Sequence, residues 1–203
     1  GLDSYQALIA GYNAAMEEFG GRITLVEANY DVKKQADQIA TLVSSGIDAM
    51  LILPTDPAGL SNAVQAAVKS GVPTFCTNCY VPGATVISTS IHDGFGMGSA
   101  TARYMAERLG GKGEVGIITL PLNEGWATRD MGMQFVFRQY PDIKIVAEWP
   151  FDATLKTTPR DAVDNMLTAH PNLAAVWCSW AAAAIEASLA MRAAGRENMI
   201  VTG

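Results

Sequence analysis

The sequence is poor in charged residues, cysteine and histidine, and it has no long apolar run. Only 17% of the 203 residues are charged, and the net charge is −6 at pH 7. An acidic chain without a basic cluster has no general attraction for nucleic acid or for anionic membranes. No run of about 18 apolar residues occurs, so no segment is predicted to span a bilayer. No signal peptide is visible, and an exported form is expected to have lost its leader.

Three cysteines, Cys76, Cys79 and Cys178, cannot form a complete disulfide framework because their number is odd. A redox C-x-x-C motif places its first cysteine at a helix N-terminus, whereas Cys76 lies in an extended segment. No second Cys or His pair completes a zinc site around Cys76 and Cys79. We therefore predict buried structural thiols, no metal and no cofactor.

Apolar residues alternate along the chain between helical spacing and short continuous runs. Strands are predicted at residues 23–27, 49–53, 74–77, 86–90, 114–119, 144–148, 175–179 and 199–202. Helices are predicted at residues 5–19, 31–46, 57–71, 96–109, 128–140, 182–194 and from a capping box at 158–161. Continuous apolar strands between helices are typical of parallel sheets buried on both faces. The predicted fold class is α/β, with doubly wound parallel sheets.

A polar stretch with glycine and proline, residues 80–93, interrupts this alternation. It predicts two lobes, residues 1–91 and residues 92–203. Ligands of open α/β sheets bind beyond the carboxyl ends of the strands. The loops expected to face a ligand are therefore residues 54–56, 77–78, 91–93, 120–129, 149–152 and Trp180.

Catalytic motifs are absent from the sequence. The glycine-rich run from Gly94 to Gly98 lacks the Lys-Ser/Thr of a P-loop, so close helix packing explains it better than a nucleotide. His92 beside Asp93 resembles a base and its orienting acid, but no nucleophile accompanies them. No G-x-S-x-G elbow occurs either. These observations favour a protein that is not an enzyme.

Several short segments, in their order and spacing, resemble the type I periplasmic sugar-binding proteins, above all their ribose-binding branch. These segments are Ile52-Leu53-Pro54-Thr55-Asp56, Gly71-Val72-Pro73, His92-Asp93 with Gly98, Arg129 with Gly132, and Leu167-Thr168-Ala169-His170-Pro171. The resemblance covers essentially the whole chain. It implies two α/β lobes, joined by three crossings, with the ligand in the cleft between them. Against this pattern the chain is expected to lack the first strand and the C-terminal part.

The resemblance also implies a function and a set of partners. The protein is expected to bind a sugar or polyol for the permease subunits of an ABC importer, as a monomer. It is expected in the periplasm or outside the cell, anchored to the membrane if it is a lipoprotein. Two alternatives remain open: the effector-binding domain of a LacI-type repressor, and an enzyme of similar architecture.

Ligand-binding positions of the family match this sequence unevenly. Tyr5 stands where the family places a stacking aromatic residue, and Arg129 falls in an Arg-x-x-Gly element that supplies a hydroxyl donor. The second arginine of that element is Met131 here. An Asp-Arg pair of the family is Asn78-Cys79, a serine is His92, and an Asn-Asp pair is Trp180-Ala181. These changes imply a ligand with fewer hydroxyls, more apolar surface or another hydroxyl pattern than ribose.

Aromatic residues after predicted strands complete the set of candidate ligand contacts. Trp126 and Trp180 lie in loops expected to face the cleft, and Trp149 and Phe151 flank Pro150 beyond a strand end. Trp177 lies inside a continuous apolar strand and is predicted to belong to the core. The predicted ligand-binding residues are Tyr5, Asn78, His92, Trp126, Arg129, Trp149, Phe151 and Trp180.

Overall fold

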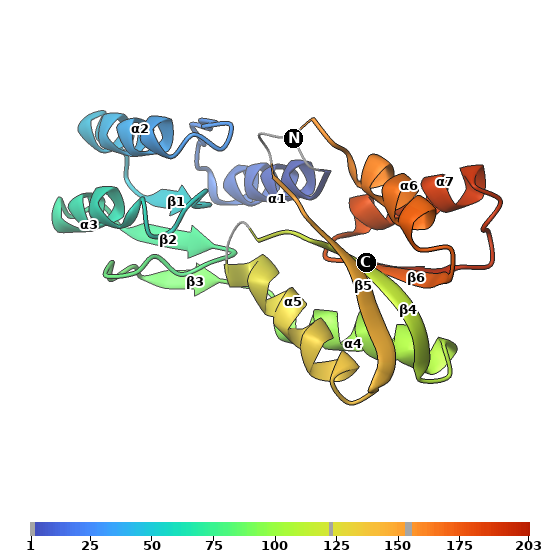
Figure 1. Ribbon diagram of the computed structural model, residues 1–203. Helices are drawn as coiled ribbons and strands as arrows, with labels where there is room; N and C mark the ends of the chain where they lie inside the picture. Colours follow the sequence, from blue (N-terminus) through green and yellow to red (C-terminus); the bar gives the residue numbers. More distant parts are fainter. Residues whose placement is uncertain (1–2, 122–123, 153–155) are drawn as a thin grey trace.

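The computed structural model describes residues 3–121, 124–152 and 156–203, and these form two separate parallel sheets (Figure 1). The first sheet has the order β1-β2-β3, and the second has the order β5-β4-β6-β7. The first contains β1 (Met50–Ile52), β2 (Thr74–Thr77) and β3 (Ser88–Ser90). The second contains β4 (Lys112–Thr119), β5 (Asp142–Pro150), β6 (Leu173–Cys178) and β7 (Ile200–Thr202). Two parallel α/β sheets agree with the predicted fold class.

The first sheet is covered by two helices, α2 (Val32–Ser44) and α3 (Ser61–Lys69), which pack against each other. The side chain of Asp31 caps α2 by accepting from the backbone N–H of Lys34. Alternate strand residues turn toward the helices, and the resulting core contains Ile39, Ile52, Val64 and Cys76. Because side chains alternate across a strand, Leu51 points the other way and is exposed.

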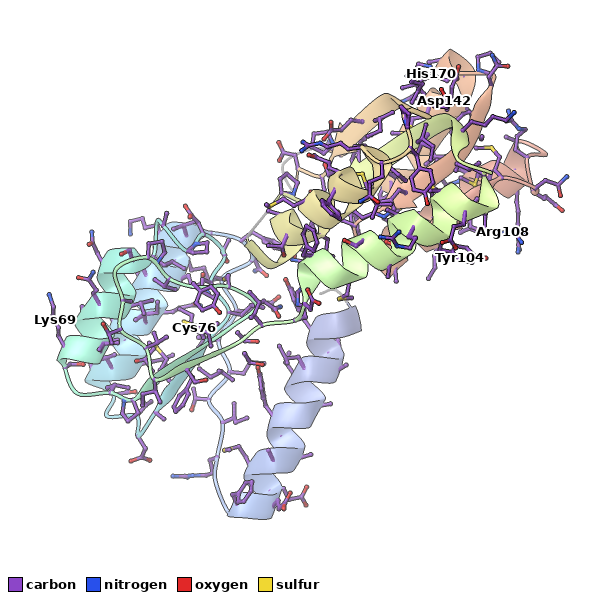
Figure 2. All side chains as sticks on the ribbon, turned by 90° about the horizontal axis from the view of Figure 1, so that it is seen from below. Lys69, Cys76, Tyr104, Arg108, Asp142 and His170 are labelled. Carbon is purple, nitrogen blue, oxygen red and sulfur yellow. The ribbon has the colours of Figure 1, made fainter. Side chains whose placement is uncertain are left out.

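The predicted strand at residues 23–27 is wrong, since residues 21–28 have no regular structure. A strand needs a neighbour for its backbone hydrogen bonds, and among the described residues β1 pairs only with β2. The segment is held instead at the side of α2, where the Gln38 amide donates to the Glu27 carbonyl at 3.1 Å. Helix α1 (Asp3–Phe19) precedes it and stands apart from α2 and α3 in Figure 2.

Both faces of the second sheet are covered, as doubly wound topology requires. Helices α4 (Gly94–Arg108) and α5 (Glu124–Phe137) pack together on one face, and α6 (Pro159–Ala169) and α7 (Ala181–Ala193) on the other. Trp177 points into the α4–α5 core, and its indole N–H donates to the Thr101 hydroxyl at 2.9 Å. Its predicted core position is confirmed.

Two helices start four residues away from their predicted positions. Helix α3 begins at Ser61 rather than at residue 57, because residues 54–60 form turns in which the Asp56 carboxylate accepts from the Ala58 N–H. Helix α5 begins at Glu124, four residues before the predicted start. The capping box of Thr158 and Asp161 is present as predicted. None of the described helices is long and apolar enough to cross a membrane.

Glycines let α4 and α5 cross at very short range. A β-carbon at Gly98 would overlap the carbonyl oxygen of Arg129, and one at Gly132 would overlap that of Phe95. A β-carbon at Gly94 would overlap the Thr128 hydroxyl and the Gly125 carbonyl oxygen. The glycine-rich run therefore serves helix packing, as the sequence indicated. It brings the first turns of α5 against the N-terminus of α4, directly after β3.

We predict that Gly98→Ala lowers the free energy of unfolding by about 1–3 kcal/mol or more, because the added methyl group meets backbone rather than a movable side chain. Gly11→Ala is the matched control, since Gly11 lies within α1 and nothing lies within 4 Å of a β-carbon there. The control is expected to leave stability unchanged or raise it by up to about 1 kcal/mol. Urea unfolding of both variants measures the difference, and equal effects would contradict the account.

Candidate functional site

The carboxyl ends of three neighbouring strands of the second sheet lie in register. Thr119 of β4 pairs with Pro150 of β5, and Ile118 pairs with Cys178 of β6. The ladder continues for one residue beyond each strand: Phe151 N–H donates to the Thr119 carbonyl at 2.8 Å, and Ser179 N–H donates to that of Ile118 at 2.9 Å. The chain goes from β4 to β5 on one side and returns to β6 on the other, so this end is a topological switch point, where open α/β sheets bind ligands.

Three predicted aromatic residues meet at this end of the sheet. The rings of Trp149 and Phe151 contact edge to face at a centroid distance of 6.1 Å, and those of Phe151 and Trp180 do so at 5.8 Å. Trp180 is 8% exposed and shares a core cluster with Trp126. Edge-to-face pairs fix the orientation of each ring, so the group forms a firm apolar wall.

Two consecutive residues of α5 hold the turn that carries Trp180. The Arg129 guanidinium donates from Nη1 to the Ser179 carbonyl at 2.8 Å, and the Ser179 hydroxyl donates to the Asp130 carboxylate. The guanidinium carbon also lies 4.3 Å from the centre of the Trp126 ring, a cation–π contact. Arg129 thus orients both tryptophans, whatever its relation to a ligand.

His92 joins this group from the segment between β3 and α4. Its Nε2 lies 3.2 Å from the Gly125 carbonyl oxygen, and its ring contacts Trp126 edge to face at 6.1 Å. Burial lowers the pKa of His92, and the nearby Arg129 cation lowers it further. The imidazole is therefore neutral at pH 7.

A second group lies at the carboxyl ends of the first sheet. Asn78 follows β2 with a positive φ of 67°, a conformation that asparagine tolerates, and its N–H donates to the Ser90 carbonyl at 2.8 Å. The next residue, Cys79, is buried. Burial raises the pKa of Tyr5 to about 12, and the neighbouring Tyr30 and Cys79 contribute to the rise. Tyr5 is thus a neutral phenol close to the end of β2.

The predicted residues therefore fall into two groups. His92, Trp126, Arg129, Trp149, Phe151 and Trp180 form one contiguous set, and Tyr5 lies near Asn78 and Cys79 in the other. The backbone hydrogen bond from Asn78 to Ser90 connects the second group to the segment that carries His92, because Ser90 lies two residues before His92 in sequence. In Figure 1 the arrowheads of β2 and β3 point toward α5, which carries Trp126 and Arg129.

Sequence reasoning missed Asp130, Ser179 and Tyr30. The only local signal for Asp130 and Ser179 is adjacency, since Asp130 follows Arg129 and Ser179 precedes Trp180, and Tyr30 has no such neighbour. Residues 122 and 123 of the predicted loop 120–129 lie outside the described residues.

All three thiols are buried, as predicted. Burial raises the pKa of Cys76 and of Cys178, which leaves both as unreactive neutral thiols. Within the described parts of the chain, no group of three or more His, Cys, Asp or Glu side chains is placed to hold a metal ion.

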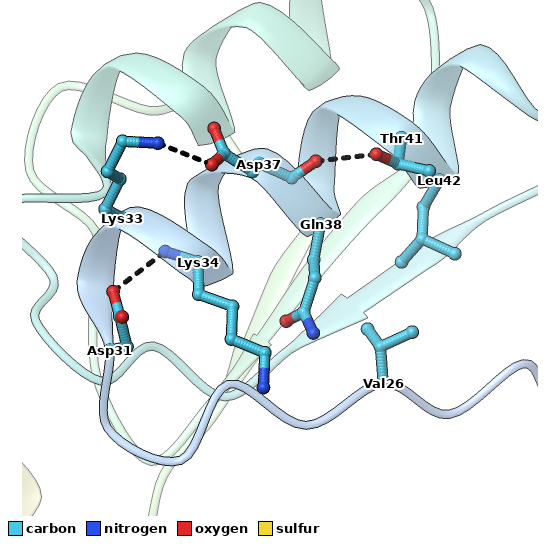
Figure 3. Close-up of a pocket in the computed structure, with 8 residues that line it drawn as sticks. All are labelled: Val26, Asp31, Lys33, Lys34, Asp37, Gln38, Thr41 and Leu42. Carbon is cyan, nitrogen blue, oxygen red and sulfur yellow. Dashed lines mark hydrogen bonds and ion pairs between the residues drawn. The ribbon is translucent and has the colours of Figure 1, made fainter.

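The groove in Figure 3 lies elsewhere, on the flank of α2. Asp31, Lys33, Lys34 and Asp37 line it together with Val26 of the irregular segment, and Lys33 pairs with Asp37 at 2.8 Å. None of the residues that line it is aromatic or belongs to a strand, so it is not part of the candidate site.

A family model described as a periplasmic binding protein domain matches residues 3–203. The chain belongs to this family. The fold and the family expected from the resemblance are therefore confirmed, and the family is one of binding proteins.

Three similar proteins illustrate the family. A xylitol-binding protein of Mycolicibacterium smegmatis is 34% identical over 122 residues, covering 60% of this chain and 35% of the relative. The ribose import binding protein of Bacillus subtilis is 25% identical over 197 residues, covering 97% of this chain and 64% of the relative. The Caulobacter myo-inositol binding protein, solved with myo-inositol, superposes with a TM-score of 0.87 at 21% identity, covering 98% of this chain and 69% of that one. The chain thus spans less than two thirds of the length of the two curated relatives.

The Asp130 carboxyl makes the site's stability depend on pH. Burial is the main cause that raises the pKa of Asp130 from 3.8 to about 6, and the nearby Glu148 raises this pKa as well. The hydrogen bond from Ser179 acts in the opposite direction and lowers the pKa. The folded state therefore keeps a proton that the unfolded chain has lost between pH 3.8 and about 6, and the free energy of unfolding falls as pH rises through this window.

We predict that Asp130→Asn, which cannot ionise, gains stability relative to the parent protein as pH rises from 4 to 7. Urea unfolding at several pH values measures the difference. Asp164→Asn, a change of an exposed carboxyl on α6, is the reference. A difference for Asp130→Asn that stays constant with pH would contradict the assignment.

Proposed function

We propose that this chain is the ligand-binding part of an extracytoplasmic receptor that takes a small neutral sugar or polyol at the carboxyl ends of its two sheets. The observation that carries the proposal is the chemistry of the groups gathered there. Neutral His92 and neutral Tyr5 accompany a wall of aromatic rings, and the Arg129 cation lies beside the Asp130 carboxylate.

This chemistry suits a neutral polyhydroxy compound better than an ion. The C–H faces of a sugar or polyol pack on aromatic rings, and its hydroxyl groups need paired donors and acceptors. A charged ligand would need an uncompensated opposite charge, whereas the Arg129 and Asp130 side chains offset each other. The names of the xylitol-, ribose- and myo-inositol-binding relatives support the same ligand class.

The biological setting belongs to the same proposal. The ribose import binding protein among the relatives supports delivery of the ligand to the permease subunits of an ABC importer. The family supports a periplasmic or extracellular location, with a lipid anchor if the protein is a lipoprotein. The receptor acts as a monomer, closes on its ligand without chemical turnover and does not bind nucleic acid.

A binding panel tests the ligand class. We predict that at least one of xylitol, ribose and myo-inositol binds saturably and is recovered unchanged. The ligand raises the melting temperature because it binds only the folded state, adding about 2.7 kcal/mol at 100 times Kd. Differential scanning fluorimetry and calorimetric titration measure both effects. Sodium citrate and small aromatic acids serve as charged comparisons, and preferential binding of these would contradict the proposal.

The role of Tyr5 is tested by removing its ring. Tyr5→Leu is expected to weaken the affinity for the best compound of the panel roughly 3- to 10-fold, because an aromatic contact contributes about 0.5–1.5 kcal/mol beyond the area it buries. Tyr104→Leu is the matched control, since Tyr104 is exposed on the outer side of α4 in Figure 2. Equal affinities of the two variants in calorimetric titration would remove Tyr5 from the site.

A further inference from the structure

Two buried N–H donors at the candidate site have no hydrogen-bond partner among the described residues. They are the indole Nε1 of Trp126 and the Nε of Arg129. Trp126 is only 6% exposed, and both N–H groups are buried. Leaving a buried N–H unpaired costs free energy, and folded proteins contain few such groups.

The chain pairs a buried indole elsewhere. The indole N–H of Trp177, which is equally enclosed, donates to the Thr101 hydroxyl at 2.9 Å. The unpaired Trp126 is therefore a local feature of the site and not a general property of tryptophan in this protein.

The two unpaired donors belong to side chains that are stacked on each other. The guanidinium carbon of Arg129 lies 4.3 Å from the centre of the Trp126 ring. Acceptors of the same group bond to other donors. The Ser179 carbonyl accepts from Arg129 Nη1, the Asp130 carboxylate accepts from the Ser179 hydroxyl, and the Gly125 carbonyl lies at hydrogen-bond distance from His92.

We infer that Trp126 Nε1 and Arg129 Nε form a donor pair that receives oxygen atoms of the bound ligand. The inference rests on the proposed function and names what the ligand must present. Both groups can only donate, so the ligand must place hydroxyl or ring oxygens with free lone pairs against them. Because the Asp130 carboxylate offsets the Arg129 charge, a neutral oxygen fits better than a carboxylate.

This donor pair sets specificity within the family's ligand class. A compound that lacks the facing oxygen leaves a cationic N–H and an indole N–H unpaired in the complex, and discrimination against such a compound is strong.

The experiment compares Trp126→Phe with Trp177→Phe. Phenylalanine keeps an aromatic ring but removes the indole N–H. In ¹⁵N-labelled protein titrated with xylitol, ribose and myo-inositol, the indole resonance assigned through Trp126→Phe is expected to move on binding, and that of Trp177 is expected to stay. Trp126→Phe is expected to weaken binding about tenfold or more, with Trp177→Phe close to the parent affinity.

A ligand-free measurement tests the donor pair separately. Since its N–H has no partner, Trp126→Phe is expected to cost less stability in urea than Trp177→Phe, which loses a hydrogen bond. An equal or larger loss would show that Trp126 already has a partner, and this overturns the inference even if no compound binds. Binding to the parent protein with an unmoved Trp126 resonance and unchanged affinity of Trp126→Phe also overturns it, while the proposed function stands. No binding by any of the three compounds contradicts the proposed function.

Discussion

The close crossing of α4 and α5 is the contact on which the candidate site depends. With glycine at positions 94, 98 and 132, the backbones of the two helices meet without intervening side chains. This close approach of the two helices brings Arg129 within reach of the Ser179 carbonyl and Asp130 within reach of the Ser179 hydroxyl. In sequence, Ser179 is 50 residues from Arg129 and 49 residues from Asp130. The turn after β6 and the start of α5 thus form one unit, and His92 ties the end of the first sheet to it through Gly125.

The electrostatics of this unit follow from burial. Removal from water disfavours the charged forms of His92 and Tyr5, and at pH 7 the Asp130 carboxylate offsets the Arg129 cation, so the site is nearly neutral at its aromatic surface. The same burial leaves the Trp126 and Arg129 donors without partners among the residues that the structure describes. A ligand with neutral oxygen acceptors relieves that cost, so part of the binding energy comes from polar groups that the fold already holds in place.

The sequence predicted what depends on local pattern. The continuous apolar run at residues 74–77 became β2, the capping box of Thr158 opens α6, and the glycine-rich run proved to be a packing surface. The prediction of a strand at residues 23–27 was wrong, because the β-branched pattern is present there but the described residues offer no neighbouring strand. The partners of Arg129 could not be predicted from the sequence either, because a backbone carbonyl has no signal in sequence. Ser179 and Asp130 meet only through the topology of the sheet. Whether Tyr5, Asn78 and Trp180 share one ligand stays a prediction.

A crystal structure of the protein grown with xylitol, ribose or myo-inositol tests the central claim most directly. The account predicts the ligand between the end of β2, with Tyr5 and Asn78, and the Trp126–Trp180 wall, with an oxygen within hydrogen-bond distance of Trp126 Nε1. A ligand bound in the charged groove on α2, or one that contacts neither aromatic group, would contradict it.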